Sequence, residues 1–229
     1  LQENGFEFEE GQHSEARIFE ADLVVKSPGI PDSVPLIVQL REKGIEVISE
    51  IEFAGRHSDA KMVCITGSNG KTTTTLLIHH ILTQAGMDAG LAGNVGNSLA
   101  AQVAGNEHPL YVVELSSFQL DGMFRFRADI AVLTNITPDH LDRYDHKFEN
   151  YIDAKFRILN NMRSSDFFIY GADSDVVDKR VKGMKIEPET ACFTYGEYAE
   201  GTGNYAGMEG DDVVVRLENR VFRISKGEI

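Results

Sequence analysis

Residues 63–73, Val-Cys-Ile-Thr-Gly-Ser-Asn-Gly-Lys-Thr-Thr, constrain the fold more than any other stretch of the chain. The apolar run at positions 62–65 has the length and composition of a buried strand. Gly67 and Gly70 then permit a tight turn. From Lys71 onward, apolar residues recur at helical spacing until Gly86: Leu77, Ile78, Ile81, Leu82 and Ala85. We therefore predict a strand, a glycine-rich loop and a helix, in this order.

This order is typical of a phosphate-binding loop. Backbone N–H groups and the helix N-terminus attract phosphates, Lys71 reaches the β- and γ-phosphate oxygens, and the Thr72 hydroxyl meets a magnesium ion. The loop departs from the common pattern at its first glycine, whose place is taken by Ile65. We predict that ATP binds to the loop residues Gly67, Ser68, Asn69, Gly70, Lys71, Thr72 and Thr73.

Length, net charge and cysteine content limit the classes of protein to which this chain can belong. A chain of 229 residues that is 42% apolar can bury one sizeable core. Its 22 basic and 36 acidic residues give a net charge of −14 with no basic run, so a nucleic-acid partner is not expected. Two cysteines, no membrane-length apolar run and no secretory leader predict a cytoplasmic location. The oligomeric state stays open, with a monomer favoured.

The residues before the loop predict a small unit of their own. Strand patterns at 21–26 and 45–48 enclose a helix around 34–40, for which Asp32 or Ser33 is the expected N-cap. This is half of a mononucleotide-binding unit. We place a boundary in the polar residues after it and predict a partial Rossmann-like domain over 1–57, followed by a second domain over 58–229.

The second domain reads as an α/β fold of the P-loop ATPase type. Apolar strands at 110–113, 130–135 and 167–170 predict a mostly parallel sheet with helices on both faces. From residue 191 onward the pattern is β, with a loop at 201–204 and a hairpin that pairs 213–217 with 221–224, which predicts a small β-rich C-terminal part. The glycine-rich residues 90–97 either bring backbone close to a ligand or form a plain loop.

Polar residues follow two of these strands. Glu114 ends the 110–113 strand opposite the loop, where a magnesium ligand is expected, although a lone glutamate there is usually just solvated. Thr137 and Pro138 are predicted to be the N-cap and first residue of a helix whose start carries Asp139, His140 and Asp142. Convergence of these groups on one sheet edge favours a ligand role over capping.

Lys155 is the third notable position. The predicted helix that contains it has an inward apolar stripe of Phe148, Tyr151, Ile152, Phe156 and Leu159. Lys155 falls on this stripe, so its amine must reach solvent, pair with an acid or take part in chemistry. Extension to solvent is the commonest of the three outcomes.

Several runs together resemble the Mur ligases of peptidoglycan synthesis. They are residues 67–72, 93–96, 114–120, 135–144 and 154–155, and their order and spacing match the family across roughly residues 20–229. The runs Glu-Leu-Ser-Ser-Phe-Gln-Leu and His-Leu-Asp-Arg-Tyr are most similar to the branch that adds D-glutamate. Branches that add other residues, and folylpolyglutamate synthase, differ at both places and remain alternatives.

The resemblance implies a reaction and a set of site residues. ATP would phosphorylate the carboxylate of UDP-N-acetylmuramoyl-L-alanine, and D-glutamate would attack the acyl phosphate. Two magnesium ions are implied, the first held by Thr72 and Glu114 and the second by His140 with a carbamylated Lys155. Lys71, His140 and Lys155 would be the catalytic residues. Positions that match substrate contacts are Ser27, Asn94, Ser116 and Gln119.

The resemblance also implies three domains, for the UDP-sugar, for ATP and for the incoming amino acid. On this basis we expect the chain to be a fragment, with only the second half of the first domain and without the third, ligase domain. Such a fragment is expected to be inactive alone. Two other classes stay open: a P-loop phosphotransferase or GTPase-like switch, and a non-catalytic nucleotide-binding module. The nucleotide and substrate specificity of turnover distinguishes them.

Overall fold

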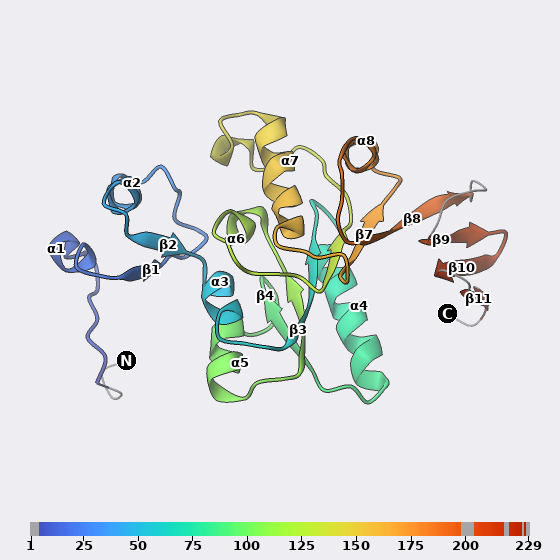
Figure 1. Cartoon of the computed structure of the whole chain (residues 1–229), viewed down its shortest axis with the longest axis horizontal. Helices are drawn as coiled ribbons and strands as arrows, with labels where there is room; N and C mark the ends of the chain where they lie inside the picture. Colours follow the sequence, from blue (N-terminus) through green and yellow to red (C-terminus); the bar gives the residue numbers. More distant parts are fainter. Residues whose placement is uncertain (1–4, 198–203, 218–219, 226, 228–229) are drawn as a thin grey trace.

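The computed structural model describes residues 5–197, 204–217, 220–225 and 227. They form a small N-terminal unit beside a larger α/β unit, shown at the left and centre of Figure 1. In the described part of the chain no helix combines the length and the apolar character needed to cross a membrane. The larger unit carries the phosphate-binding loop.

The N-terminal unit is a parallel pair of strands with one crossover helix. Its elements are α1 (Glu15–Ile18), β1 (Leu23–Val25), α2 (Pro35–Glu42) and β2 (Glu46–Ile48). The predicted cap of α2 was wrong: Val34 occupies the N-cap position and Pro35 begins the helix. Proline suits this position because its φ is already helical, and because an N–H at the first helical position would have no acceptor within the helix. Asp32 instead pairs with Arg41 at 3.0 Å and Lys26 at 3.3 Å.

The larger sheet confirms the predicted α/β class. Its strand order is β11-β10-β9-β8-β7-β6-β3-β5-β4, with parallel pairing from β4 through to β9 and antiparallel pairing between β9, β10 and β11. The strands are β3 (Lys61–Thr66), β4 (Ala89–Gly93), β5 (Leu110–Glu114), β6 (Ile130–Leu133), β7 (Phe167–Gly171), β8 (Glu189–Glu197), β9 (Asn204–Glu209), β10 (Asp212–Leu217) and β11 (Arg220–Ser225). The predicted hairpin is β10–β11, and these strands extend the main sheet; the expected loop at 201–204 lies largely outside the described residues.

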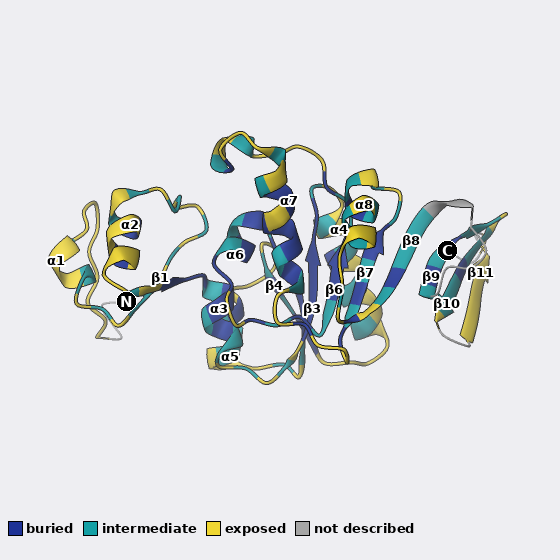
Figure 2. Ribbon diagram, turned by 45° about the horizontal axis from the view of Figure 1, so that its top comes forward, coloured by how far each residue is buried: buried dark blue, intermediate teal, exposed yellow. Residues whose placement is uncertain are grey.

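Helices cover both faces of this sheet, as predicted. They are α3 (Glu50–Gly55), α4 (Lys71–Gln84), α5 (Leu99–Gly105), α6 (Ser117–Asp121), α7 (Phe148–Phe156) and α8 (Asp175–Gly183), with 3-10 turns η2 (Leu141–Arg143) and η3 (Arg157–Leu159). α4 packs on one face, and α3, α5, α6, α7 and α8 contribute to the core on the other. Figure 2 shows buried residues concentrated in the central strands and on α3, α6 and α7.

Two local predictions were wrong in part. Of the apolar stripe on α4, only Ile78 and Leu82 pack against the sheet, while Leu77 and Ile81 are 55% and 56% exposed. These two pairs form adjacent rows on the helix, and only one row can face a flat sheet. The glycine-rich residues 90–97 also begin as strand β4, because Gly93 packs directly against β5: a Cβ there would lie 2.1 Å from the Glu114 carbonyl oxygen.

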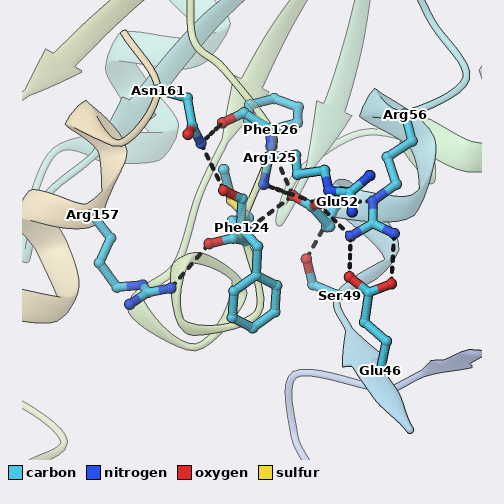
Figure 3. A network of polar contacts seen from close by, with 10 residues as sticks. Glu46, Ser49, Glu52, Arg56, Phe124, Arg125, Phe126, Arg157 and Asn161 are labelled. Carbon is cyan, nitrogen blue, oxygen red and sulfur yellow. Dashed lines mark hydrogen bonds and ion pairs between the residues drawn. The ribbon is translucent and has the colours of Figure 1, made fainter. Parts of the chain in front are cut away.

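A buried carboxylate ties the N-terminal unit to the larger one (Figure 3). Glu52 on α3 is fully buried and accepts hydrogen bonds from the backbone N–H groups of residues 124–126 at 2.8–3.0 Å. Arg56, one turn further along α3, donates to Glu52 and to Glu46 of β2. Strand β2, helix α3 and the 124–126 loop are therefore held by one network of charge-assisted hydrogen bonds.

We expect Glu52→Gln to destabilise the chain by roughly 3 kcal/mol. The amide NH₂ of glutamine would face backbone N–H donors, and the Arg56 guanidinium would lose the negative charge that Glu52 places beside it. For a chain of this size the unfolding temperature should fall by roughly 6–12 °C. Urea denaturation followed by circular dichroism measures the effect. Glu42→Gln, an exposed change on α2 with the same loss of charge, is the control and should stay within about 0.5 kcal/mol of wild type. Equal stability of the two variants would contradict the role of Glu52.

Candidate active site

The glycine-rich loop joins β3 to α4, as the sequence predicted. Gly70 is the N-cap of α4 and has a φ of 79°, which glycine adopts without steric cost. Gly67 has a φ of 148°, and a Cβ there would lie 1.9 Å from the Thr134 hydroxyl. Gly70 is needed for its backbone conformation. Gly67 is needed for its conformation and also because the loop after β6 approaches it closely.

Residues 134–137, which follow β6, brace the loop. Thr134 Oγ1 donates to the Asn69 carbonyl at 2.7 Å, and Asn135 Oδ1 accepts from the Asn69 N–H at 2.9 Å. The Ser68 hydroxyl donates to the Thr137 carbonyl and accepts from the Thr137 N–H, at 2.9 and 3.0 Å. These bonds hold the backbone amides of the loop in place before any phosphate binds, which is the preorganisation that anion sites need.

The same bonds overturn the prediction of a helix that starts at Thr137. Because Thr137 uses its backbone N–H and C=O on Ser68, residues 135–140 form an irregular connection without helix or strand. Helical structure appears only as the short turn η2, and His140 before it has a left-handed φ of 50°. The residues still reach the carboxyl edge of the sheet, but on a loop.

Two lysines contact the phosphate-binding loop. Lys71 donates to the Ser68 carbonyl at 2.9 Å. Lys155, only 2% exposed, donates to the Gly67 carbonyl at 2.9 Å and to the Thr66 hydroxyl at 3.3 Å. Burial, and second the positive charge of Lys71, lower the pKa of Lys155 to about 7. The burial of Lys155 rules out extension of its amine to solvent, and among the described residues it forms no ion pair.

Glu114 has a free oxygen in a buried position. The residue is 1% exposed, and its Oε1 accepts from the Asn94 side-chain amide at 2.9 Å. Its Oε2 is buried and, among the described residues, has no hydrogen-bond partner. An unpaired buried carboxylate oxygen is costly, and a hard cation such as Mg²⁺ would compensate it. The residue therefore fits a metal-binding role, and Thr72, exposed in the first turn of α4, supplies a hydroxyl from the loop side.

A cavity of about 300 Å³ lies between the N-terminal unit and the larger one. Of the predicted site residues it brings together Lys71, Asn94, Ser116, His140 and Lys155. The backbone turn at Pro28 and Gly29 forms its wall on the side of the N-terminal unit. The cavity therefore joins residues from the loop, from the ends of β4 and β5, and from α7.

The other predicted positions lie outside the cavity wall. Ser27 is exposed and directly precedes Pro28 at its rim. Gln119 is buried, and its side-chain oxygen accepts from the Ser116 N–H and hydroxyl at 2.9 and 3.0 Å. With the Ser116 hydroxyl accepting from the Gln119 N–H, the two form a capping box at the start of α6. Gln119 thus orients Ser116, which itself faces the cavity.

His140 lies at the open side of the cavity. Its side chain is 54% exposed and its ring packs 5.2 Å from that of Phe118. Across the described residues, no three His, Cys, Asp or Glu side chains meet as a ready metal site. The carboxylate of Asp139 lies beside His140, with Oδ2 3.5 Å from Nε2, and also lines the cavity, whereas an unmodified Lys155 supplies no anionic ligand there.

Tyr151 and Phe118 are site residues that sequence reasoning missed. Both line the cavity, and the Tyr151 hydroxyl lies 3.2 Å from the Ser68 hydroxyl. Tyr151 was interpreted only as part of the apolar stripe of its helix. Its phenolic oxygen was the available signal, because a tyrosine on a buried face needs a polar partner.

The family model described as the Mur ligase middle domain matches residues 65–227, well over half of the chain. The chain belongs to the Mur ligase family. Proteins named UDP-N-acetylmuramoylalanine--D-glutamate ligase are similar to it: one from Bacteroides fragilis is 56% identical over 94% of this chain and 48% of its own length. One from Porphyromonas gingivalis is 60% identical over 93% of this chain and 47% of its own length. The chain spans about half the length of the curated relatives it matches.

Solved Mur ligase structures have the same fold. UDP-N-acetylmuramate:L-alanyl-gamma-D-glutamyl-meso-diaminopimelate ligase from Neisseria meningitides matches with a TM-score of 0.59 at 19% identity, over 92% of this chain and 70% of that one. The MurF ligase from Thermotoga maritima, solved in complex with ADP, matches with a TM-score of 0.54 at 15% identity, over 89% of this chain and 54% of that one. At these identities the Mur ligase structures support the fold alone.

Proposed function

We propose that the chain is the central part of an ATP-dependent ligase that adds D-glutamate to UDP-N-acetylmuramoyl-L-alanine, in the synthesis of peptidoglycan precursors. The main support for the proposal is the cavity, because it joins Lys71 of the phosphate-binding loop and Lys155 of α7, which contacts that loop, to polar groups from β4, α6 and the 135–140 loop. Relatives of this name at 56–60% identity support the choice of D-glutamate among the family's amino acids.

The reaction proceeds in two steps. An oxygen of the substrate carboxylate attacks the γ-phosphorus of ATP, the bond to ADP breaks, and an acyl phosphate forms. The amine of D-glutamate then attacks the acyl carbon, loses a proton, and the tetrahedral adduct expels phosphate to leave the amide. Both steps concentrate negative charge, so catalysis depends on positioned cations and N–H donors. Lys71 would leave the Ser68 carbonyl and bind the β- and γ-phosphate oxygens.

We propose metal ligands among the polar side chains around the cavity and the phosphate-binding loop. Glu114, through its unpartnered oxygen, and Thr72 would hold the first magnesium ion. His140 and a carbamylated Lys155 would hold the second. Bound magnesium neutralises phosphate and carboxylate charge. Ser27, Asn94, Ser116 and Gln119 are proposed to bind or orient the UDP-sugar substrate.

The proposed division into domains is that of the Mur ligase family. Residues 1–57 would belong to the domain for the UDP-sugar and residues 58–229 to the ATP-binding domain, with a third domain supplied by a longer protein. Helix α3 packs into the core of the larger unit through Ile51 and Ala54, so the two proposed domains share a firm contact. We propose a cytoplasmic, monomeric enzyme without a nucleic-acid partner.

A direct assay tests the function. A full-length ligase that contains this chain is incubated with UDP-N-acetylmuramoyl-L-alanine, ATP and one amino acid at a time, and ADP and the amide product are both quantified. We expect equal amounts of ADP and product with D-glutamate and neither with L-glutamate or L-lysine. Nucleotide hydrolysis that needs no amino acid would instead support a phosphotransferase or a GTPase-like switch.

A further inference from the structure

Helix α6 presents Ser116 to the cavity but is too short to hold its own position. It comprises five residues, Ser117–Asp121, and an isolated helix of this length is unstable in water. Its N-terminal end is capped internally by the Ser116 and Gln119 box. The position of its other end must therefore come from contacts with the rest of the fold.

Arg157 supplies two of these contacts at the C-terminal end of α6, where the Tyr144 hydroxyl also donates to Asp121 at 2.8 Å. Its Nε donates to the Leu120 carbonyl and its Nη2 to the Met123 carbonyl, both at 2.9 Å. The last carbonyls of a helix have no partner within the helix, and a cation there also interacts favourably with the helix dipole. Arg157 directly follows α7, two residues beyond Lys155, so the same stretch of chain holds both Lys155 and the end of α6.

The residues after α6 are held from two sides (Figure 3). Asn161 donates to the carbonyls of Phe124 and Phe126 at 2.8 and 3.0 Å. Glu52 accepts the N–H groups of residues 124–126 from the opposite side. With both its carbonyls and its amides bound, the 120–126 segment is a rigid attachment for α6.

We propose that Arg157 is a positioning residue that sets the place of Ser116 relative to Lys155 in the substrate cavity. Its planar guanidinium binds two carbonyls at once, which the single ammonium of lysine cannot reproduce at the same geometry. The phosphate-binding loop is built on β3 and α4 and is braced by residues 134–137, while Lys155 and Tyr151 of α7 contact it from positions before Arg157. Arg157 itself binds only α6 and the residues after it, so its effect falls mainly on binding of the UDP-sugar and much less on ATP; this role rests on the proposed ligase function.

The test compares Arg157→Lys with wild type in the full-length ligase, at a temperature well below unfolding of either. We expect the KM for UDP-N-acetylmuramoyl-L-alanine to rise about tenfold, since misplacement of a substrate contact by a fraction of an ångström is costly. The KM for ATP should change less than about twofold. Arg163→Lys, at an exposed arginine six positions further on, is the matched control and should leave both constants unchanged.

A loss of stability without a positioning role would lower kcat through the active fraction and leave both KM values unchanged, and that result overturns the proposal. An equal rise of both KM values overturns it as well. If Arg157→Lys does not fold, Asn161→Ala decides: a selective rise in the KM for the UDP-sugar supports the proposal, and wild-type values reject it. A wild-type enzyme without D-glutamate ligation rejects the proposed function itself, whereas active wild type with unchanged variants rejects only the role of Arg157.

Discussion

Replacement of Lys71 by alanine is expected to lower kcat of the full-length ligase by at least about 10²-fold while the fold persists. The lysine stabilises charge that develops on the β- and γ-phosphate oxygens during transfer, and no other side chain of the loop is cationic. Among the described residues its ammonium group is hydrogen-bonded to the Ser68 carbonyl of the loop and to no core side chain, so its removal opens no cavity in the core. We therefore expect the Lys71→Ala variant to lose turnover while its stability stays near that of wild type.

The measurement is steady-state turnover with D-glutamate, together with thermal unfolding. Lys185→Ala, at an exposed lysine beyond α8, removes the same charge and should behave as wild type. Because the positive charge of Lys71 contributes to the lowered pKa of Lys155, the Lys71→Ala variant should also show a higher pKa at Lys155. Near-normal rates in Lys71→Ala would mean that the loop does not bind the transferred phosphate.

We expect Lys155 to carry a carbamate in the active enzyme, and its loss to have the second large effect. The pKa of Lys155 is lowered to about 7, mainly by burial, so above that pH much of the amine is neutral and nucleophilic. The nitrogen attacks the carbon of CO₂, one C–O electron pair moves to oxygen, and an N–H proton leaves to solvent. The side chain changes from a cation into an anion with two oxygens, which is a ligand type that magnesium prefers.

The pH dependence of labelling follows from this pKa. Below about pH 7 the folded protein keeps the ammonium form and labelling by ¹³CO₂ should fall; above it labelling should approach completion. The same pKa also makes the stability of the fold depend on pH. Between about pH 7 and pH 10.5, the ordinary pKa of a lysine, the unfolded chain binds a proton that the folded chain does not, so this residue makes the free energy of unfolding rise with pH.

Lys155→Ala tests the catalytic part of this expectation. Activity of the full-length ligase should drop below about 1% of wild type, as for the loss of other charge-stabilising groups, and acetate should restore part of it by supplying a carboxylate in the vacated space. Carbon-13 NMR of wild type in ¹³CO₂ should show a carbamate signal that the variant lacks. Full activity of wild type in CO₂-depleted buffer, with no labelled carbamate, would reject the carbamate.

The sequence by itself determined the elements whose pattern is local. The loop between β3 and α4, the apolar strands β5, β6 and β7, and the buried face of α7 were all predicted from runs of a few residues. Such runs carry their own signal, because hydrophobic periodicity and glycine positions depend on near neighbours. The family resemblance likewise came from short runs in a fixed order.

Only the tertiary structure decided what the predicted residues contact. The sequence predicted a helix that begins at Thr137, but hydrogen bonds to Ser68, 69 positions away, hold Thr137 in an irregular loop. Lys155 had three local interpretations, and its burial against the Gly67 carbonyl ruled out extension to solvent. The free oxygen of Glu114 and the hold of Arg157 on α6 had no sequence signal. These outcomes depend on contacts between residues far apart in the chain, and no local pattern encodes which partners the packed sheet brings within hydrogen-bond distance.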